Sequence, residues 1–339
     1  MRQRNGSCET ITIIVPLVNE QDGLGALHSR LAAVLESLGC NWDVLFIDDG
    51  STDNTLSKLK ELNRRDPRIR AVSLSRNFGK ETAVAAGLQY ASGDAAIIID
   101  ADLQHPPEVL PEFVERWREG YDIVYGQRLD RKAHWATHHP LAHGYYALFR
   151  ALSGIPLRAG SGDFRLLSRK AIDAMNQLGE RARFNKALYS WIGFKAIGVP
   201  YMPAERLVGR PKWKLRRLIE FAIDGITAFS TIPLRVWSLL GFAISLAALA
   251  YAIYFLVLTL VIGGDVPGFP SLIISIMFLS GVQLISLGVL GEYLGRVYEE
   301  VKQRPLYLVA EEVGIQKNVG RESAVRSELK TGAGTTVAG

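Results

Sequence analysis

The chain has 339 residues, of which 48% are hydrophobic, and a formal net charge of +5. This length fits a soluble domain plus a membrane anchor better than one soluble domain, because the longest apolar runs lie toward the C-terminal end. The only cysteines, Cys8 and Cys40, exclude a disulfide framework and a zinc-binding cysteine cluster, so we expect a reducing compartment.

The first part of the chain alternates short apolar runs with segments of helical periodicity. The polar segment Met1 to Thr10 has no apolar secretion signal, so we expect the part that follows to stay in the cytosol. Strands are predicted over 11–16, 44–47, 71–74 and 95–99, and helices over 24–38 and 54–64. The alternation predicts an α/β fold with a mostly parallel sheet flanked by helices, in a catalytic domain over residues 1–213.

Polar and acidic residues follow all four predicted strands. They occupy residues 16–20, 48–51, 75–77 and 100–102. Ligands of parallel sheets bind outside the carboxyl ends of the strands, so these segments are candidates for a binding site. No glycine-rich dinucleotide fingerprint and no Walker sequence follows any of these strands, which argues against a dinucleotide cofactor.

Asp100 and Asp102 end the fourth predicted strand, separated by one residue. Such a pair can hold a hard divalent cation, Mg²⁺ or Mn²⁺, through oxygen ligands. An isolated Asp-x-Asp is often only a turn or a helix cap, and its place at a strand end favours the metal interpretation.

Two membrane spans are predicted over 236–263 and 269–292, joined by residues 264–268, and no charged side chain lies within 236–263 or 269–291. Each is long enough to span a bilayer; the alternative is a helical hairpin buried in a soluble core. Residues 214–235 alternate basic and apolar side chains, which predicts an amphipathic helix in the membrane interface or else an ordinary surface helix. We expect residues 293–339 to be cytosolic and to be disordered after about 317.

Basic residues on both sides of the two spans predict their orientation. The connecting loop has no Lys or Arg, whereas basic residues flank the pair: Arg206, Arg210, Lys212, Lys214, Arg216, Arg217, Arg235, Arg296, Lys302 and Arg304. The positive-inside rule therefore predicts a multi-pass protein of the inner (plasma) membrane with the catalytic domain and both termini cytoplasmic. Two lone spans are also compatible with a homo-oligomer.

Five segments in order carry a family resemblance: VPLVNE (Val15 to Glu20), FIDDGSTD (Phe46 to Asp53), SRNFGKE (Ser75 to Glu81), DADLQHPP (Asp100 to Pro107) and GDFRLLSR (Gly162 to Arg169). Together they resemble glycosyltransferase family 2. The two apolar runs and the ending GEYLGRVYEEVKQRPLY resemble its bacterial polyprenyl-phosphate glycosyltransferases, relatives of dolichyl-phosphate mannosyltransferase and bactoprenol glucosyltransferase. The resemblance implies a GT-A fold, Mg²⁺ or Mn²⁺, and inverting transfer from a nucleotide-sugar, with a UDP-hexose favoured, to undecaprenyl or another polyprenyl phosphate.

The resemblance also assigns roles to individual residues. The donor would be bound by Pro16, Val18, Glu20, Ile47, Asp49, Lys80, Asp100, Ala101, Arg128, Arg206 and Lys212. Asp100 and Asp102 would bind the metal, and Gln104, Arg131 and Lys132 would meet the acceptor phosphate. Asp163 is the best candidate for a catalytic carboxylate, either as a base or as an electrostatic organiser of Arg165; the alternative is a structural Asp in a turn.

Two other functions compete with this interpretation. A processive polysaccharide synthase shares the donor chemistry, but it would carry a Gln-x-x-Arg-Trp motif and more spans, and the sequence has neither. A membrane-tethered module without catalytic activity could bind anionic ligands or nucleic acid through its basic residues. Those residues flank the predicted spans, where anionic lipid headgroups account for them, so we expect no nucleic-acid partner.

Overall fold

The computed structural model describes residues 9–129, 149–154, 161–181, 183–203, 230–262 and 268–315. By its internal contacts the chain divides into two compact units. The first unit runs to Ala101 and includes the chain from Tyr307 onward, and the second comprises Asp102–Leu306.

The described residues of the first unit form five strands and three helices. They are β1 (Thr10–Leu17), α1 (Leu24–Glu36), β2 (Asn41–Asp48), α2 (Thr55–Arg65), β3 (Ile69–Leu74), α3 (Lys80–Tyr90), β4 (Ala95–Ile98) and β8 (Val309–Val313). The strands lie in the order β4-β1-β2-β3-β8, all parallel except β8. The four strands and two helices predicted from the sequence of this region are therefore confirmed.

Burial explains why these segments form these elements. In β1 the side chains of Ile11, Ile13 and Ile14 are fully buried, as expected for a central strand covered on both faces. Helix α1 buries its leucines at spacings of three and four residues, which places them on one face: Leu24, Leu27, Leu31 and Leu35. The apolar pattern thus fixes both the strand positions and the helix face that packs inward.

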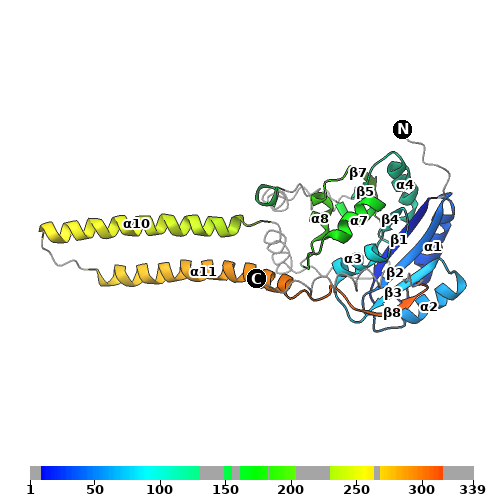
Figure 1. The fold of residues 1–339 in the computed structure, drawn as a ribbon, viewed down its shortest axis with the longest axis horizontal. Coiled ribbons are helices and arrows are strands. Elements are labelled where there is room, and N and C mark those ends of the chain that lie inside the picture. Colours follow the sequence, from blue (N-terminus) through cyan, green and yellow to red (C-terminus); the bar gives the residue numbers. More distant parts are fainter. Residues whose placement is uncertain are drawn as a thin grey trace, which may run out of the picture. The chain divides into compact units, whose positions relative to one another are not determined.

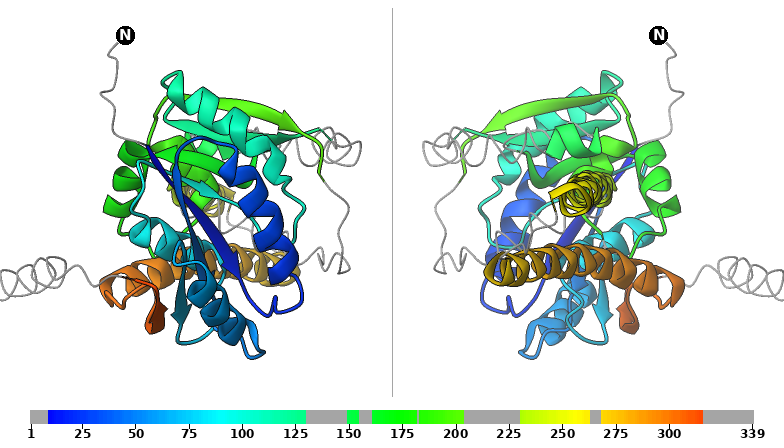
Figure 2. Two further views of the ribbon diagram at one scale, coloured as in Figure 1. Left: turned by 90° about the vertical axis from the view of Figure 1, so that its right-hand side faces the viewer. Right: turned by 90° about the vertical axis from the view of Figure 1, so that its left-hand side faces the viewer.

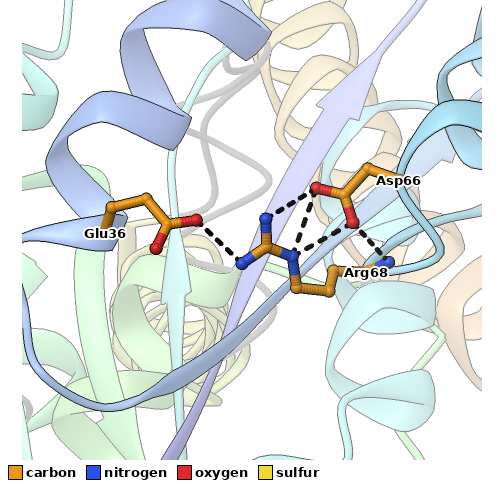
Figure 3. Close-up of polar contacts among 3 residues, drawn as sticks. All are labelled: Glu36, Asp66 and Arg68. Carbon is orange, nitrogen blue, oxygen red and sulfur yellow. Dashed lines mark hydrogen bonds and ion pairs between the residues drawn. The ribbon is translucent and has the colours of Figure 1, made fainter.

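A group of charges joins the end of α1 to the turn before β3 (Figure 3). The guanidinium of Arg68 donates hydrogen bonds to Glu36 at 2.9 Å and to Asp66, and it lies 3.7 Å from the ring centroid of Trp42. The hydrogen bond from Arg68 holds the pKa of Asp66 below its ordinary value, against the opposing effect of burial.

Strand β8 was not predicted from the sequence. It pairs antiparallel with β3, and in Figure 2 its orange-red ribbon lies beside the blue to cyan strands of the same unit. The Tyr90 hydroxyl donates a hydrogen bond to Glu312 at 2.6 Å, and Lys60 forms an ion pair with Glu311 at 2.7 Å. The chain that follows the second apolar helix therefore returns to the edge of this sheet.

The described residues of the second unit include three further strands and two long helices. Its elements are η1 (Pro107–Val109), α4 (Leu110–Arg118), β5 (Ile123–Arg128), β6 (Ser161–Ser168), α7 (Arg169–Gln177), α8 (Asn185–Trp191), β7 (Ala196–Tyr201), α10 (Ile232–Ile262) and α11 (Phe269–Val301). Strand β5 lies between β6, which is antiparallel to it, and β7, which is parallel. The Ser168 hydroxyl caps α7 by accepting the N–H of Ala171.

Helices α10 and α11, yellow and orange in Figure 1, cover the two predicted spans. Both are long and apolar enough to cross a membrane, and their most apolar windows, Leu234–Tyr251 and Ser275–Val301, are 0% buried by protein. The mostly parallel strands flanked by helices, followed by these two helices, confirm the predicted fold class. The predicted interfacial helix up to residue 229 and the predicted disorder after 317 lie outside the described residues.

Candidate active site

The loops after β1 and β2 hold each other by reciprocal hydrogen bonds. The N–H of Asn19 donates to the Ser51 hydroxyl at 2.8 Å, and the N–H of Thr52 donates to the Asn19 side-chain oxygen at 2.8 Å. Asn19 adopts a left-handed backbone conformation with φ 54°, which is uncommon for a residue other than glycine and often marks a functional site. The two predicted donor loops are thus tied to each other by their own hydrogen bonds.

The same pair of loops is tied further along by Glu20 and Asp53. The N–H of Glu20 donates to the Thr55 hydroxyl at 3.1 Å, and the N–H of Gln21 donates to Asp53 at 3.4 Å. Burial works to raise the pKa of Asp53, but hydrogen bonds from Thr55 and Gln21 outweigh it and lower that pKa. Asp53 is therefore an ionised anchor of the loop at neutral pH.

Two buried carboxylates lie at the end of β2. Asp48 is 1% exposed and accepts the Ser51 N–H at 3.0 Å and the Ser73 hydroxyl at 2.7 Å. Asp49 is 4% exposed, and its two oxygens accept the N–H groups of Phe78 and Gly79 at 2.7 and 2.9 Å. Asp49, predicted to bind the donor, thus holds the loop that leads into α3.

The other predicted donor residues of this region differ in exposure. The side chain of Ile47 is fully buried in the sheet, and Pro16 is buried as well, so a nucleoside could meet them through their backbone. Val18 is 38% exposed just beyond the end of β1. An exposed apolar side chain beside a rigid polar loop is a suitable contact for the face of a base.

Lys80, the first residue of α3, contacts Asp100, which lies two residues after the end of β4. Its ammonium lies 2.6 Å from one carboxylate oxygen of Asp100 and 2.8 Å from the other. The structure thus brings together two residues that the sequence assigned to the diphosphate and the metal. A cation already sits at the carboxylate, and Asp100 stays partly open to solvent, with 26% of its side chain exposed.

In the second unit the chain turns sharply at Asp102. Its side chain accepts the N–H of Gln104 at 3.1 Å, and Leu103 between them has a left-handed φ of 57°. The Asp102 side chain is thereby held against the backbone two residues further along the chain, as in an Asx turn. Both Asp102 and Gln104 are partly exposed.

An aromatic cluster supports this turn and the predicted catalytic strand. His105 stacks on Phe164, with ring centroids 4.8 Å apart and planes at 8°, and both pack edge-on against Tyr201. Because Phe164 follows Asp163 on β6, the stack ties the Asp102 turn to the strand of Asp163. Sequence reasoning did not assign a role to His105, although it lies inside the DADLQHPP segment.

The two candidate catalytic residues of β6 have different surroundings. Asp163 is partly exposed, whereas Arg165 is 3% exposed, with its guanidinium 3.7 Å from the ring centroid of Tyr189. Arg165 also donates a hydrogen bond to the carbonyl of Gly162. Arg165 is therefore placed to shape the backbone around Asp163 from beneath the surface.

The remaining predicted cations are described only in part. Arg128 is exposed at the end of β5, where Leu129 N–H donates to the Tyr201 carbonyl at 3.0 Å. Four predicted phosphate contacts lie outside the described residues: Arg131, Lys132, Arg206 and Lys212.

The described residues contain no group of three or more His, Cys, Asp or Glu side chains that could hold a metal ion. Any cation at Asp100 or Asp102 would therefore need further oxygen ligands from water or a bound diphosphate. A set of carboxylate oxygens completed in this way is chemically suited to Mg²⁺ or Mn²⁺.

Comparison with known proteins gives the family. The family described as Glycosyl transferase family 2 matches residues 12–175. An uncharacterized glycosyltransferase of Synechocystis is 47% identical over 90% of this chain and 96% of its own length. The chain belongs to glycosyltransferase family 2.

Other relatives cover this glycosyltransferase to a similar extent. The uncharacterized glycosyltransferase YkcC of Bacillus subtilis is 40% identical over 90% of this chain and 94% of its own length. The bactoprenol glucosyl transferase of Shigella phage SfII is 42% identical over 88% of this chain and 97% of its own length. The glucosyl-3-phosphoglycerate synthase structure from Mycobacterium tuberculosis is more distant: 20% identical, covering 67% of this chain and 84% of that one, with a TM-score of 0.41.

Proposed function

We propose that this glycosyltransferase moves a hexose from a UDP-hexose to undecaprenyl phosphate or another polyprenyl phosphate, with inversion at the sugar carbon and release of UDP. The observation that carries the proposal is the 42% identity, over 97% of its length, to a relative named bactoprenol glucosyl transferase. Helices α10 and α11 support it, because an enzyme that acts on a polyprenyl lipid must reach the membrane.

Asp100 and Asp102 are the proposed ligands of Mg²⁺ or Mn²⁺. Because only one residue separates them, their Cα atoms lie within about 7 Å of each other. When bound, the cation offsets the negative charge that builds on the leaving diphosphate. Ala101 would offer its backbone to the ribose, and the rigid loops that carry Val18, Glu20 and Asp49 would hold the nucleoside.

The acceptor phosphate needs little activation. A phosphate monoester has a second pKa near about 6, so much of it is a dianion at neutral pH and can attack the sugar carbon itself. The oxygen–carbon bond to the lipid phosphate forms as the bond from the sugar to the UDP oxygen breaks. Asp163 then serves to orient the acceptor and its cations, with Arg165 fixing the Asp163 backbone, and the rate comes chiefly from positioning and charge stabilisation.

Cations from several segments, together with the neutral amide of Gln104, would contact the phosphates. Lys80, Arg128, Arg206 and Lys212 are proposed for the donor diphosphate, and Gln104, Arg131 and Lys132 for the acceptor phosphate. Arg128 is exposed at a strand end in the second unit, as such a role requires.

We also propose that the catalytic part and both termini face the cytoplasm. The loop 264–268 lacks Lys and Arg, whereas basic residues flank the two helices on the other side. A single cysteine at Val266 in a chain with Cys8 and Cys40 replaced by Ser tests this. A membrane-impermeant thiol reagent added to intact cells should label this Val266→Cys chain and should not label the wild-type chain, which carries Cys8 and Cys40; labelling of the wild-type chain alone would reverse the orientation.

The reaction is tested by incubating the full-length protein in detergent with undecaprenyl phosphate and a panel of labelled UDP- and GDP-sugars. We expect a chloroform-soluble labelled product with a UDP-hexose in the presence of Mg²⁺ or Mn²⁺, and none after chelation. Asp102→Ala should lower the rate by about two orders of magnitude or more. Asp173→Ala, which removes an exposed carboxylate from α7 in the same unit, is the matched control and should not change the rate.

Each result bears on a separate part of the proposal. A labelled lipid formed equally well without metal would overturn the cation and its ligands. Product from a GDP-sugar alone would overturn the UDP donor. Absence of any lipid product with every donor would overturn the acceptor, and polymer retained at the origin of a chromatogram would indicate a processive synthase.

A further inference from the structure

The ammonium of Lys80 contacts both carboxylate oxygens of Asp100, as a divalent cation bound side-on to that carboxylate would. The ammonium lies within 2.6 and 2.8 Å of the two oxygens. A divalent cation bound side-on to that carboxylate would need the same oxygens. The ammonium of Lys80 and such a cation therefore cannot occupy this position together.

The position of Lys80 at the start of α3 does not stabilise the helix. It is the first residue of α3, where the helix macrodipole disfavours positive charge. The start of the helix is nevertheless fixed, because Asp49 holds the N–H groups of Phe78 and Gly79 just before it. A buried carboxylate thus sets where the chain enters α3, and the lysine that follows is directed at Asp100.

The Lys80–Asp100 ion pair can readily break so that each group contacts another ion. Side-chain exposure is 45% for Lys80 and 26% for Asp100, so solvent and small ions reach both groups. Ion pairs at such exposure are weak. A lysine is a flexible point charge on four methylenes, so it can leave one anion and reach another nearby without movement of the backbone.

We propose that Lys80 is an exchangeable counter-ion: it neutralises Asp100 when no divalent cation is bound, and it turns to the diphosphate of the donor when the cation takes the carboxylate. This inference rests on the proposed function in treating Asp100 as a metal ligand. Lys80 then disfavours the cation alone and favours the cation together with the nucleotide. Binding of metal and nucleoside diphosphate is coupled through this one side chain.

The test measures Mn²⁺ and UDP binding to the full-length protein in detergent. Free Mn²⁺ is read from its paramagnetic resonance signal, and UDP is titrated calorimetrically with and without saturating Mn²⁺. In Lys80→Met, Mn²⁺ alone should bind up to about fivefold more tightly, because its competitor is gone. UDP should bind about tenfold more weakly in the presence of Mn²⁺, because a charge-assisted contact to the diphosphate is lost.

Two further variants separate this role from general electrostatics. Arg76→Met removes another exposed positive charge, four residues earlier on the loop after β3, where the guanidinium lies 4.2 Å from the ring centroid of Phe78. It should leave Mn²⁺ affinity near the wild-type value. In an Asp100→Asn background, Lys80→Met should no longer change Mn²⁺ affinity, because the contested carboxylate is absent.

The proposal is overturned if Lys80→Met binds Mn²⁺ no more tightly than wild type, or if Arg76→Met shows the same gain. Thermal unfolding of each variant confirms that it is folded before binding is compared. Transfer to lipid is not a readout, so a protein with the expected Mn²⁺ pattern but no lipid product would refute the proposed acceptor and leave the role of Lys80 intact. Wild-type protein that binds no Mn²⁺ even with UDP would refute both the metal site and the exchange.

Discussion

Asp49 accepts a hydrogen bond from the backbone N–H of Gly79 at 2.9 Å. Its other oxygen accepts the N–H of Phe78 at 2.7 Å, and the residue is 4% exposed. A carboxylate in this position satisfies two neighbouring backbone donors at once, as no neutral side chain of the same shape can. It connects the loop after β2 to the start of α3, and so to Lys80.

We expect Asp49→Asn to destabilise the protein by about 1–3 kcal/mol, because the amide NH₂ would face one of the two N–H donors and leave it unsatisfied. Thermal or denaturant unfolding in detergent measures this. Glu61→Gln, an exposed change on α2 in the same unit, is the control and should stay within about 0.5 kcal/mol of wild type. Equal stability of Asp49→Asn and wild type would show that these two hydrogen bonds contribute little.

Gly50 and Gly39 make a matched pair, since both have left-handed backbones, with φ of 67° and 62°. A Cβ at Gly50 would lie 2.3 Å from the carbonyl carbon of Arg76, whereas nothing lies within 4 Å of one at Gly39. Gly39→Ala should therefore cost only the conformational penalty of about 1–2 kcal/mol. Gly50→Ala should cost more than about 4 kcal/mol or prevent folding, because backbone must move.

Unfolding of the two alanine variants and the amount of folded protein recovered check this comparison. Similar losses of stability in Gly50→Ala and Gly39→Ala would mean that the backbone of the loop after β3 shifts at little energetic cost. The rigidity inferred for the donor loops would then be wrong.

The contact between Arg68 and Asp66 makes stability depend on pH in the acid range (Figure 3). The pKa of Asp66 is lowered in the folded protein, so its contribution is present above the ordinary value of 3.8 and is lost as pH falls below it. Because 46% of the Arg68 side chain is exposed, we expect Arg68→Ala to lose no more than about 1 kcal/mol at pH 7. The difference in the free energy of unfolding between Arg68→Ala and wild type should decrease when unfolding is measured at successively lower pH, down to about 3.

Glu180 makes the stability of the fold depend on pH in the direction opposite to Asp66. Burial, and then the charge of Glu300, raise the pKa of Glu180 above 4.5, against the effect of Arg183. The folded state thus holds this proton more tightly than the unfolded state, so its contribution to stability falls as pH rises through the raised pKa. Glu180→Gln should raise the melting temperature at pH 8 by roughly 2 °C.

The gain from Glu180→Gln should shrink as the pH is lowered toward 4.5, because protonation removes the disfavoured negative charge from the wild type. Glu112→Gln on α4, whose carboxylate is exposed beside Arg116, should show no such pH-dependent gain. A lower melting temperature for Glu180→Gln at pH 8 would mean that the ionised carboxylate stabilises the fold.

The sequence predicted the first four strands, the helices α1 and α2, and two apolar helices. These elements follow from local periodicity: fully apolar runs make central strands, and leucines three and four residues apart make one helix face. Strand β8 was missed because its residues, VAEEV, carry two adjacent charges and pair with β3, more than 200 positions earlier in the chain. Such pairing is decided by partners that no local pattern shows.

For the candidate site, the residue types and their places after the strands predicted the acidic pair and the strand-end loops, and the resemblance of five segments indicated the family. That was possible because carboxylates and cations placed directly after buried strands collect at one edge of a sheet. Only the tertiary structure showed that Asp49 accepts hydrogen bonds from backbone N–H groups, that His105 stacks on Phe164, and that Lys80 forms an ion pair with Asp100. The direction of a side chain depends on which neighbours satisfy it, and those neighbours come from other elements of the fold.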